Sequence, residues 1–433
     1  MIEKWLIKGG RLVDPVRGLN ETGDLYIEGG LIATLPPGET AVGTATEIDA
    51  RGLIVSPGFI DLHVHFREPG NEEAETNVSG SRAAARGGFT SVVTMPNTRP
   101  AIDSPELVAD LIERSQACGF VRILPSACIS RSRNGADLAD LRALAAAGAV
   151  AFTDDGSTVA DEGLMREAMR AAGAIGKPIM DHALDPDLAG NGVMHEGKAS
   201  RRLGLPGIPA VAEDRIVERN IRLCEETHCA VHIQHVSSAG AVKLMRRARE
   251  KQLPVSGEVT PHHLALCDED VDAGNPDFKM NPPLRSEADR KALVAAVADG
   301  VLQALATDHA PHRGQDKKMG FLAAPFGVVG LETAVGVTYQ VLVRSGRMSL
   351  TEWIRRWTEG PAKILGIPPP TLAPGSIADV TLFDLEHEWS VRANEFASRS
   401  RNTPFEGRLL VGRAVATWCG GRLTWRETSQ MRS

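Results

Sequence analysis

Short apolar runs alternate with alanine-rich, helix-forming stretches through the middle of the chain, and this alternation limits the possible folds more than any other feature. Alternating strand and helix signals indicate βα units around a parallel sheet. Eight strand candidates can be counted, at residues 60–66, 91–95, 122–126, 150–153, 178–181, 230–235, 254–259 and 303–307, with helix-like stretches such as 105–118 and 287–298 between them. Eight units predict an α/β fold of the (β/α)8, TIM-like barrel type. An open, doubly wound sheet would give a similar pattern.

The two ends of the chain differ from this middle part. Short β-rich runs separated by glycine-containing turn signals occur before residue 56 and return after the proline cluster at 368–370. We therefore expect a small composite β-sandwich domain built from both chain ends. Its N-terminal part would be residues 1–56 and its C-terminal part residues 368–433, and the barrel would span residues 57–367.

Composition excludes several classes of protein. The formal net charge is -7 and no basic block is present, which argues against a nucleic-acid partner. The six cysteines are widely spaced without a CxxC pair, as expected for reduced thiols. The first residues carry charges where a signal peptide would be apolar, and no apolar run is long enough to span a membrane. We expect a soluble, cytoplasmic protein with no membrane association.

Potential metal ligands follow five of the eight predicted strands. His63 and His65 end the first, Asp154 and Asp155 follow the fourth, His182 the fifth, His235 the sixth and Asp308 the eighth. A single histidine at a strand end more often packs than binds metal, but the strand ends of one barrel converge on one face. Four histidines and two carboxylates there could hold two metal ions ~3.5–4 Å apart around a shared hydroxide. Nitrogen and oxygen ligands suit zinc, with cobalt or manganese as substitutes.

Six motifs in order resemble those of the bacterial class I dihydroorotases of the amidohydrolase superfamily. They are HVHFREPG at 63–70, MPNT at 95–98, FTDDG at 152–156, GLPGIP at 204–209, KMNPPLR at 279–285 and ATDHAPH at 306–312. The resemblance covers the whole barrel and the flanking β segments. It implies a zinc-dependent cyclic amidohydrolase that reversibly cyclises N-carbamoyl-L-aspartate to L-dihydroorotate in de novo pyrimidine (UMP) biosynthesis, with one or two Zn²⁺ ions per subunit.

The resemblance also implies a role for each site residue. His63, His65, Asp155 and Asp308 would hold one metal, and Asp155, His182 and His235 the second, with Asp155 as the bridge. Hydantoinases place a carbamylated lysine at the bridge, but residues 151–156 contain no lysine. Asp308 would be the catalytic residue: it takes the proton from the zinc-activated hydroxide and passes it to the leaving ring nitrogen, as a general base that becomes a general acid.

The resemblance places a further set of residues around the substrate. They are His65, Arg67, Asn97, Asn281, His312, Phe326 and Gly327. The planar guanidinium of Arg67 suits the substrate carboxylate. Without the resemblance, Asn97, Asn281 and Gly327 would be interpreted as turn residues. The remaining histidines are left as structural or undecided: His195, His228, His232, His262, His263, His309 and His387.

Some alternatives stay open at the level of sequence. Residues 311–325 are either a lid over the site or an ordinary surface loop. A hydantoinase or allantoinase shares the barrel and the HxH strand end, although the missing lysine and the presence of Arg67 and Asn97 oppose it. A silent subunit that only holds aspartate transcarbamoylase has no need of six converging ligands. Association with aspartate transcarbamoylase is still possible, and a homo-oligomer is the family expectation.

Overall fold

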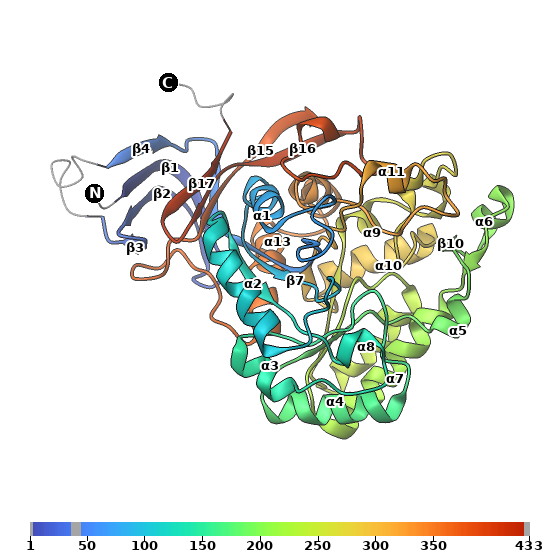
Figure 1. Cartoon of the computed structure of the whole chain (residues 1–433). Helices are drawn as coiled ribbons and strands as arrows, with labels where there is room; N and C mark the ends of the chain where they lie inside the picture. Colours follow the sequence, from blue (N-terminus) through green and yellow to red (C-terminus); the bar gives the residue numbers. More distant parts are fainter. Residues whose placement is uncertain (1–2, 36–44, 428–433) are drawn as a thin grey trace.

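The computed structural model describes residues 3–35 and 45–427 (Figure 1). The strands are β1 (Lys4–Asp14), β2 (Leu19–Glu28), β3 (Leu31–Ala33), β4 (Thr46–Asp49), β5 (Ile54–Pro57), β6 (Phe59–Val64), β7 (Phe89–Thr94), β8 (Arg122–Pro125), β9 (Ile179–Asp181), β10 (Met194–His195), β11 (Gly207–Ile208), β12 (Val231–Ile233), β13 (Val255–Val259), β14 (Ala304–Leu305), β15 (Val380–Ser390), β16 (Leu409–Cys419) and β17 (Arg422–Arg426). The helices are α1 (Asn77–Arg86), α2 (Pro105–Cys118), α3 (Leu141–Ala147), α4 (Glu162–Ala174), α5 (Pro186–Ala189), α6 (Lys198–Leu203), α7 (Val211–Thr227), α8 (Ala239–Glu250), α9 (Pro261–Ala265), α10 (Glu287–Ala298), α11 (Gly314–Lys317), α12 (Ala334–Thr338), α13 (Leu350–Trp357) and α14 (Glu359–Leu365).

Strands from the two ends of the chain share one eight-stranded sheet, seen at the left and top of Figure 1 in blue and red. Its order is β17-β16-β15-β5-β1-β2-β3, with β4 paired to β1. The two ends meet where β5 and β15 pair antiparallel, with Val55 opposite Leu382. Ile7, Val380 and Trp418 belong to the apolar cluster of this sheet and are fully buried.

Parallel strands form two larger sheets, β6-β7-β8 and β9-β12-β13-β14, and a separate two-stranded sheet, β10-β11. Isolated bridges join the two larger sheets, because Phe152 pairs with both Ala127 and Ile179, and Val64 pairs with His309. The parallel strands therefore follow one another in chain order as a ring, and the first meets the last. The α/β class predicted from the sequence is confirmed.

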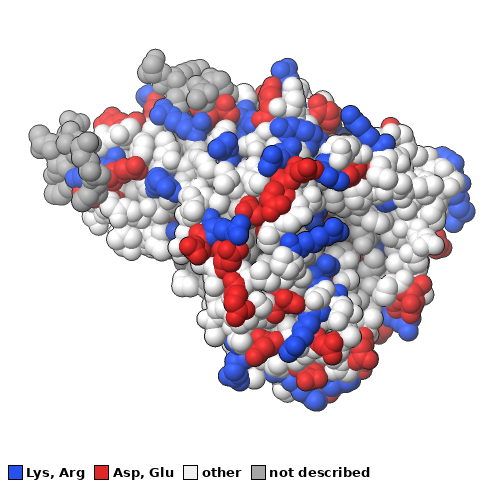
Figure 2. Space-filling view, in the orientation of Figure 1, with Lys and Arg blue, Asp and Glu red and all other residues white. Residues whose placement is uncertain are grey.

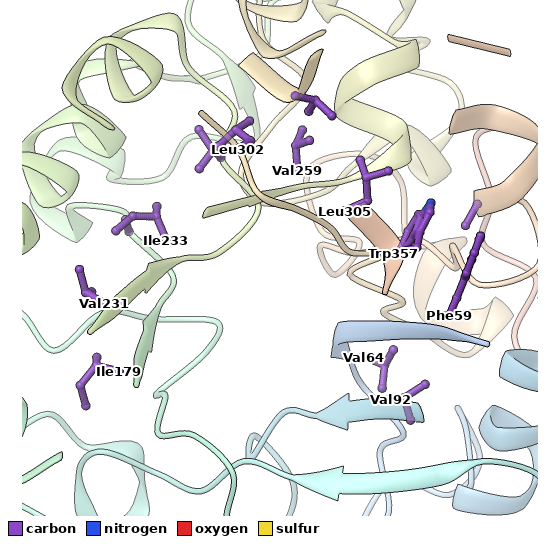
Figure 3. Close-up of a cluster of buried hydrophobic side chains, with 14 of the residues drawn as sticks. Phe59, Val64, Val92, Ile179, Val231, Ile233, Val259, Leu302, Leu305 and Trp357 are labelled. Carbon is purple, nitrogen blue, oxygen red and sulfur yellow. The ribbon is translucent and has the colours of Figure 1, made fainter. Parts of the chain in front are cut away.

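Successive residues of the ring strands face two different apolar clusters. Val92 of β7 and Ile179 of β9 pack outward with helix residues, whereas their neighbours Val93 and Met180 pack with Leu62 inside the ring. This division follows from the two-residue side-chain period of a strand. Figure 3 shows the outer cluster spaced around the strands. The inner side is filled by side chains, so the site can form only where the strands end.

The two helices predicted at 105–118 and 287–298 are α2 and α10, with the predicted bounds. Each begins after a serine whose hydroxyl accepts a backbone N–H of the first turn, Ser104 for α2 and Ser286 for α10. Such caps satisfy amides that have no partner within the helix. Helix α2 ends at Gly119, which has φ 69° and takes the left-handed conformation that favours glycine.

The fourth predicted strand, at 150–153, is only a single bridging residue in the structure. It retains the single bridging residue Phe152, whose N–H donates to Pro178 and whose carbonyl accepts from Met180. Helix α3 ends just before it, with its C-cap at Gly148, and the polar turn at Asp154 follows at once. Few residues are left between the end of this helix and the turn, so the strand pairing at Phe152 cannot extend further.

Within residues 3–35 and 45–427, the structure contains no helix with both the length and the apolar character needed to cross a bilayer. On the face shown in Figure 2, Lys and Arg are interspersed with Asp and Glu. No field of a single sign dominates that face, in keeping with the modest net charge of -7.

Candidate metal centre and active site

The six side chains predicted as metal ligands come together at the carboxyl ends of the ring strands. His63 lies in β6 and His65 just beyond it, Asp155 follows the bridge at Phe152, His182 follows β9, His235 follows β12 and Asp308 follows β14. All six residues are at most 6% exposed. The backbone thus places side chains from strands that are distant in sequence in one small, buried volume.

Asp155 lies at the centre of the cluster. Its Oδ1 is 3.2 Å from His63 Nε2, 3.7 Å from His182 Nδ1 and 3.8 Å from His235 Nε2, and its Oδ2 is 3.4 Å from His65 Nε2. Two groups could each hold a metal ion, namely His63, His65 and Asp155, and Asp155, His182 and His235. Asp155 belongs to both, which is the geometry of a bridging ligand.

Asp308 faces the first of these groups. Its Oδ1 lies 3.1 Å from His65 Nε2 and 3.5 Å from His63 Nε2. Asp308 has φ 47° and His235 has φ 33°, in the region that side chains other than glycine seldom adopt. Such strain persists where the surrounding structure enforces it, and it is concentrated at functional sites. Both strained residues point their side chains into the cluster.

Two buried atoms in the cluster have no hydrogen-bond partner: His63 Nε2 and Asp155 Oδ1. An unpaired buried polar atom is costly, so each one in a native structure calls for an explanation. A cation between them would satisfy both lone pairs. The donor set of imidazole nitrogens and carboxylate oxygens also suits zinc or a similar divalent ion. The residues present therefore fit a metal centre.

The charges of the cluster are coupled. Burial opposes protonation of His63, but the Asp155 and Asp308 carboxylates outweigh it and raise the pKa of His63 well above its usual value. Burial likewise opposes ionisation of Asp155, but the nearby histidines, His63 first, hold its pKa well below its usual range. Both carboxylates are therefore ionised, and their negative charge favours a positive group within the cluster.

Glu258 of β13 is a site residue that sequence reasoning missed. Its Oε1 accepts from His63 Nδ1 at 2.8 Å, and its Oε2 lies 3.0 Å from Nε2 of His232, a histidine that the sequence left undecided. Both side chains are fully buried. An acceptor at Nδ1 fixes the His63 tautomer and leaves Nε2 free for a metal. The available signal was an acidic residue inside an otherwise apolar strand, at Gly257-Glu258-Val259.

Three of the other undecided histidines have polar contacts. His263 bonds the Thr260 hydroxyl and the Pro282 carbonyl, His309 contacts Glu75, and His195 lies 3.4 Å from Arg285. His228 is the left-handed C-cap of α7. His262 is buried beside the cluster, and its Nε2 has no hydrogen-bond partner.

The predicted substrate-binding residues lie next to the clustered metal-ligand candidates. Asn97 Oδ1 is 3.0 Å from His65 Nδ1, and Asn281 Nδ2 is 3.1 Å from His182 Nε2. Arg67 donates from Nε to the Pro311 carbonyl, and burial lowers the pKa of its guanidinium to about 10, so it stays charged at neutral pH.

His312, Phe326 and Gly327 complete this group. His312 Nε2 donates to the Phe326 carbonyl at 2.7 Å, and burial, aided by Arg67, lowers the pKa of His312 to about 3. Gly327 has φ 134°, and a Cβ there would lie 2.9 Å from His312 Nε2. Only glycine fits, because both the conformation and the close approach exclude a side chain.

Comparison with solved structures defines the class of protein. The chain superposes on an L-hydantoinase (dihydropyrimidinase) from Arthrobacter aurescens with a TM-score of 0.87 and 25% identity, covering 100% of this chain and 98% of that one. A D-hydantoinase from Bacillus sp. AR9 gives 0.84 and 26%, covering 99% and 96%. With this fold and the clustered histidines and aspartates, the chain is a cyclic amidohydrolase.

Sequence comparison narrows the class to one family. The family model described as dihydro-orotase-like matches residues 52–241. The dihydroorotase of Anaeromyxobacter dehalogenans strain 2CP-1 is 47% identical over 429 residues, 99% of each chain, and that of Pelotomaculum thermopropionicum is 47% identical over 427 residues, 98% of this chain and 99% of the other. The chain belongs to the dihydroorotase family, as the sequence motifs predicted.

Proposed function

We propose that the protein is a zinc-dependent dihydroorotase that interconverts N-carbamoyl-L-aspartate and L-dihydroorotate in pyrimidine synthesis. The observation that carries the proposal is the pair of candidate metal-binding groups that share Asp155, together with the Arg67 guanidinium and two amide side chains nearby. Near identity in length with curated dihydroorotases supports it. The dihydroorotase relatives and the chemistry of the site residues thus both indicate hydrolysis of a cyclic amide.

The proposal includes a role for each group. When bound, one or two zinc ions would polarise the ring amide carbonyl and acidify a water molecule. Asp308 would accept the proton and donate it to the leaving ring nitrogen, since its carboxylate is ionised and 3.1 Å from His65. Arg67 would bind the substrate carboxylate. Neutral His312, which donates to the Phe326 carbonyl, would hold the segment at Phe326 in place.

Several features of wider scope belong to the same proposal. We take the ring of parallel strands as a (β/α)8 barrel spanning residues 57–367, and the eight-stranded sheet as the small β domain of residues 1–56 and 368–433. A cytoplasmic location is proposed from the dihydroorotase relatives. A homo-oligomer, and association with aspartate transcarbamoylase, are proposed from the family alone.

The test is the hydrolysis of dihydroorotate by purified, zinc-loaded protein, compared with hydantoin and allantoin, with and without aspartate transcarbamoylase. We expect turnover of dihydroorotate, and its loss in His63→Ala because one metal group loses a ligand. Exposed His228, the C-cap of α7, supplies the control as His228→Asn, because asparagine tolerates the left-handed φ of 57°. Faster turnover of another ureide would move the assignment to the hydantoinases, and no turnover even with the partner would indicate a silent subunit.

A further inference from the structure

Lys317 is a buried lysine beside the substrate-binding residues that the proposed reaction does not use. It ends the short helix α11, in the segment after β14, and is 5% exposed. Its neighbour Lys318 is exposed. Taking a lysine ammonium out of water is costly, and burial lowers the pKa of Lys317 to about 8. Simple packing would not require a charged group at this position.

The Lys317 ammonium is held by backbone carbonyls. Its Nζ donates to the carbonyls of Gly327 at 3.0 Å, Pro325 at 3.1 Å and Lys279 at 3.3 Å. Three acceptors match the three N–H donors of an ammonium. Among the described residues no carboxylate forms a salt bridge with Lys317, so these carbonyls are its principal partners. The side chain is therefore placed by the backbone around it.

These three carbonyls belong to two segments that carry predicted substrate-binding residues. Residues 279–281 end in Asn281, and residues 325–327 contain Phe326 and Gly327. The segments also contact each other directly, since the Gly327 N–H donates to the Lys279 carbonyl at 2.9 Å. Lys279 places its own ammonium 4.5 Å from the centre of the Phe326 ring. Lys317 therefore connects the two segments through hydrogen bonds to both of them.

A shift of residues 279–281 or 325–327 would be transmitted to the substrate-binding side chains. His312 donates to the Phe326 carbonyl at 2.7 Å, and an Arg67 terminal nitrogen lies 3.4 Å from His312 Nε2. A Cβ at Gly327 would lie 2.9 Å from His312 Nε2, so there is no room for a side chain between these two residues. The path from Lys317 to the guanidinium is therefore short and made of direct contacts. By contrast, no contact between Lys317 and the six clustered ligands is present in the described residues.

We propose that Lys317 is a positioning residue that holds residues 279–281 and 325–327 in the shape that binds the substrate. On this view, residues 311–325 form a fixed wall of the site and do not act as a free lid. The inference rests on the proposed dihydroorotase function, because it assigns part of the substrate affinity to Lys317. It predicts that substrate binding and metal binding can be separated by mutation.

The experiment compares steady-state kinetics and zinc content of the full-length wild type, Lys317→Met and Lys318→Met. Methionine has a similar length but cannot donate to the three carbonyls. We expect KM for dihydroorotate to rise about tenfold in Lys317→Met, since a small misplacement of positioning groups weakens binding severely, with kcat within about twofold and zinc content unchanged. Lys318→Met should match the wild type because that side chain is exposed.

A second variant, Lys317→Arg, keeps the charge but offers a planar donor group that cannot meet the three carbonyls in the same way. We expect a folded protein with a raised KM. A wild-type KM in Lys317→Arg, or a loss of kcat and zinc together in Lys317→Met, would overturn the inference. If Lys317→Met does not fold, the arginine variant decides alone. An inactive wild type would instead overturn the proposed function, and the inference with it.

Discussion

Glu258 lies outside the two candidate metal-binding groups but orients His63, which lies within one of them. It joins His63 to His232, and it also accepts the backbone N–H of His235 at 3.2 Å. Two of the predicted ligands therefore depend on one fully buried carboxylate. Its negative charge would also strengthen His63 as the predicted ligand, since a carboxylate partner raises the basicity of an imidazole.

We predict that Glu258→Gln weakens metal binding about 10–100-fold, the usual effect of removing such a partner. Glutamine preserves the size of the side chain but can present an amide N–H to His63 Nδ1, which would favour the wrong tautomer. Metal content after dialysis against graded chelator measures the effect. The control is Glu250→Gln, at an exposed position at the end of α8. Equal metal retention in both variants would refute the role assigned to Glu258.

The sequence predicted the histidines and aspartates of the site because each directly follows an apolar strand run. It could not assign Glu258 or Lys317, because a single charged residue in a strand or loop carries no spacing signal. Asp154 and Asp155 illustrate the same limit. Asp154 accepts the N–H groups of Ile129 and Ser130 and so stabilises a loop, while Asp155 enters the cluster. Only the resemblance to a family separated these two neighbours.

At the scale of elements, a buried carboxylate anchors the end of α1. Glu332 accepts the backbone N–H groups of Ala397 and Ser398 and lies 3.1 Å from Arg86, the last residue of that helix. Burial raises the pKa of Glu332 from 4.5 to about 7, although Arg86 opposes the rise. Between pH 4.5 and 7, the native protein therefore retains a proton on Glu332 that the unfolded chain has already released.

This difference predicts a pH dependence of stability. Between pH 4.5 and 7 the folded state binds more protons than the unfolded state, so the free energy of unfolding falls as the pH rises. Glu332→Gln removes the titration, and the wild type should lose up to about 3 kcal/mol relative to this variant from pH 5 to pH 8. Urea unfolding at several pH values measures it. Parallel curves for the two proteins would contradict the prediction.

Helices were predicted more accurately than strands. The bounds of α2 and α10 follow from local signals, a capping serine before each helix and apolar periodicity within it. The strand at 150–153 failed because the length of a strand depends on partners elsewhere in the chain. Phe152 finds partners at Ala127 and Ile179 for one bridge each and no more.

At the scale of the whole molecule, an aromatic cluster joins the parallel ring to the eight-stranded sheet. Phe59 of β6 lies 4.7 Å from Phe383 of β15 and 5.3 Å from Trp353, and it stacks on Trp357 at 5.7 Å, between ring centroids. All four residues are fully buried. Phe59 begins β6, at the end opposite to His63 and the metal cluster.

We predict that Phe383→Ala lowers the free energy of unfolding by about 3–5 kcal/mol, the usual cost of removing a buried phenylalanine ring. KM for dihydroorotate should not change, because the cavity forms at the far end of the ring strands. Urea unfolding and steady-state kinetics test both parts. Leu409→Ala is the control, since Leu409 is an apolar residue of the same sheet that is 57% exposed. A changed KM would mean that the sheet supports the site.

The sequence by itself determined the α/β class, the metal-ligand candidates and the family. These depend on short-range patterns, such as a strand followed by a histidine or a motif of fixed spacing, which neighbouring residues carry. The tertiary structure alone decided that Glu258 contacts His63 and that Lys317 donates to three backbone carbonyls. The Glu258–His63 contact joins residues 195 positions apart, and the Lys317–Lys279 contact joins residues 38 positions apart. Such contacts exist only once the chain has folded and brought these segments together.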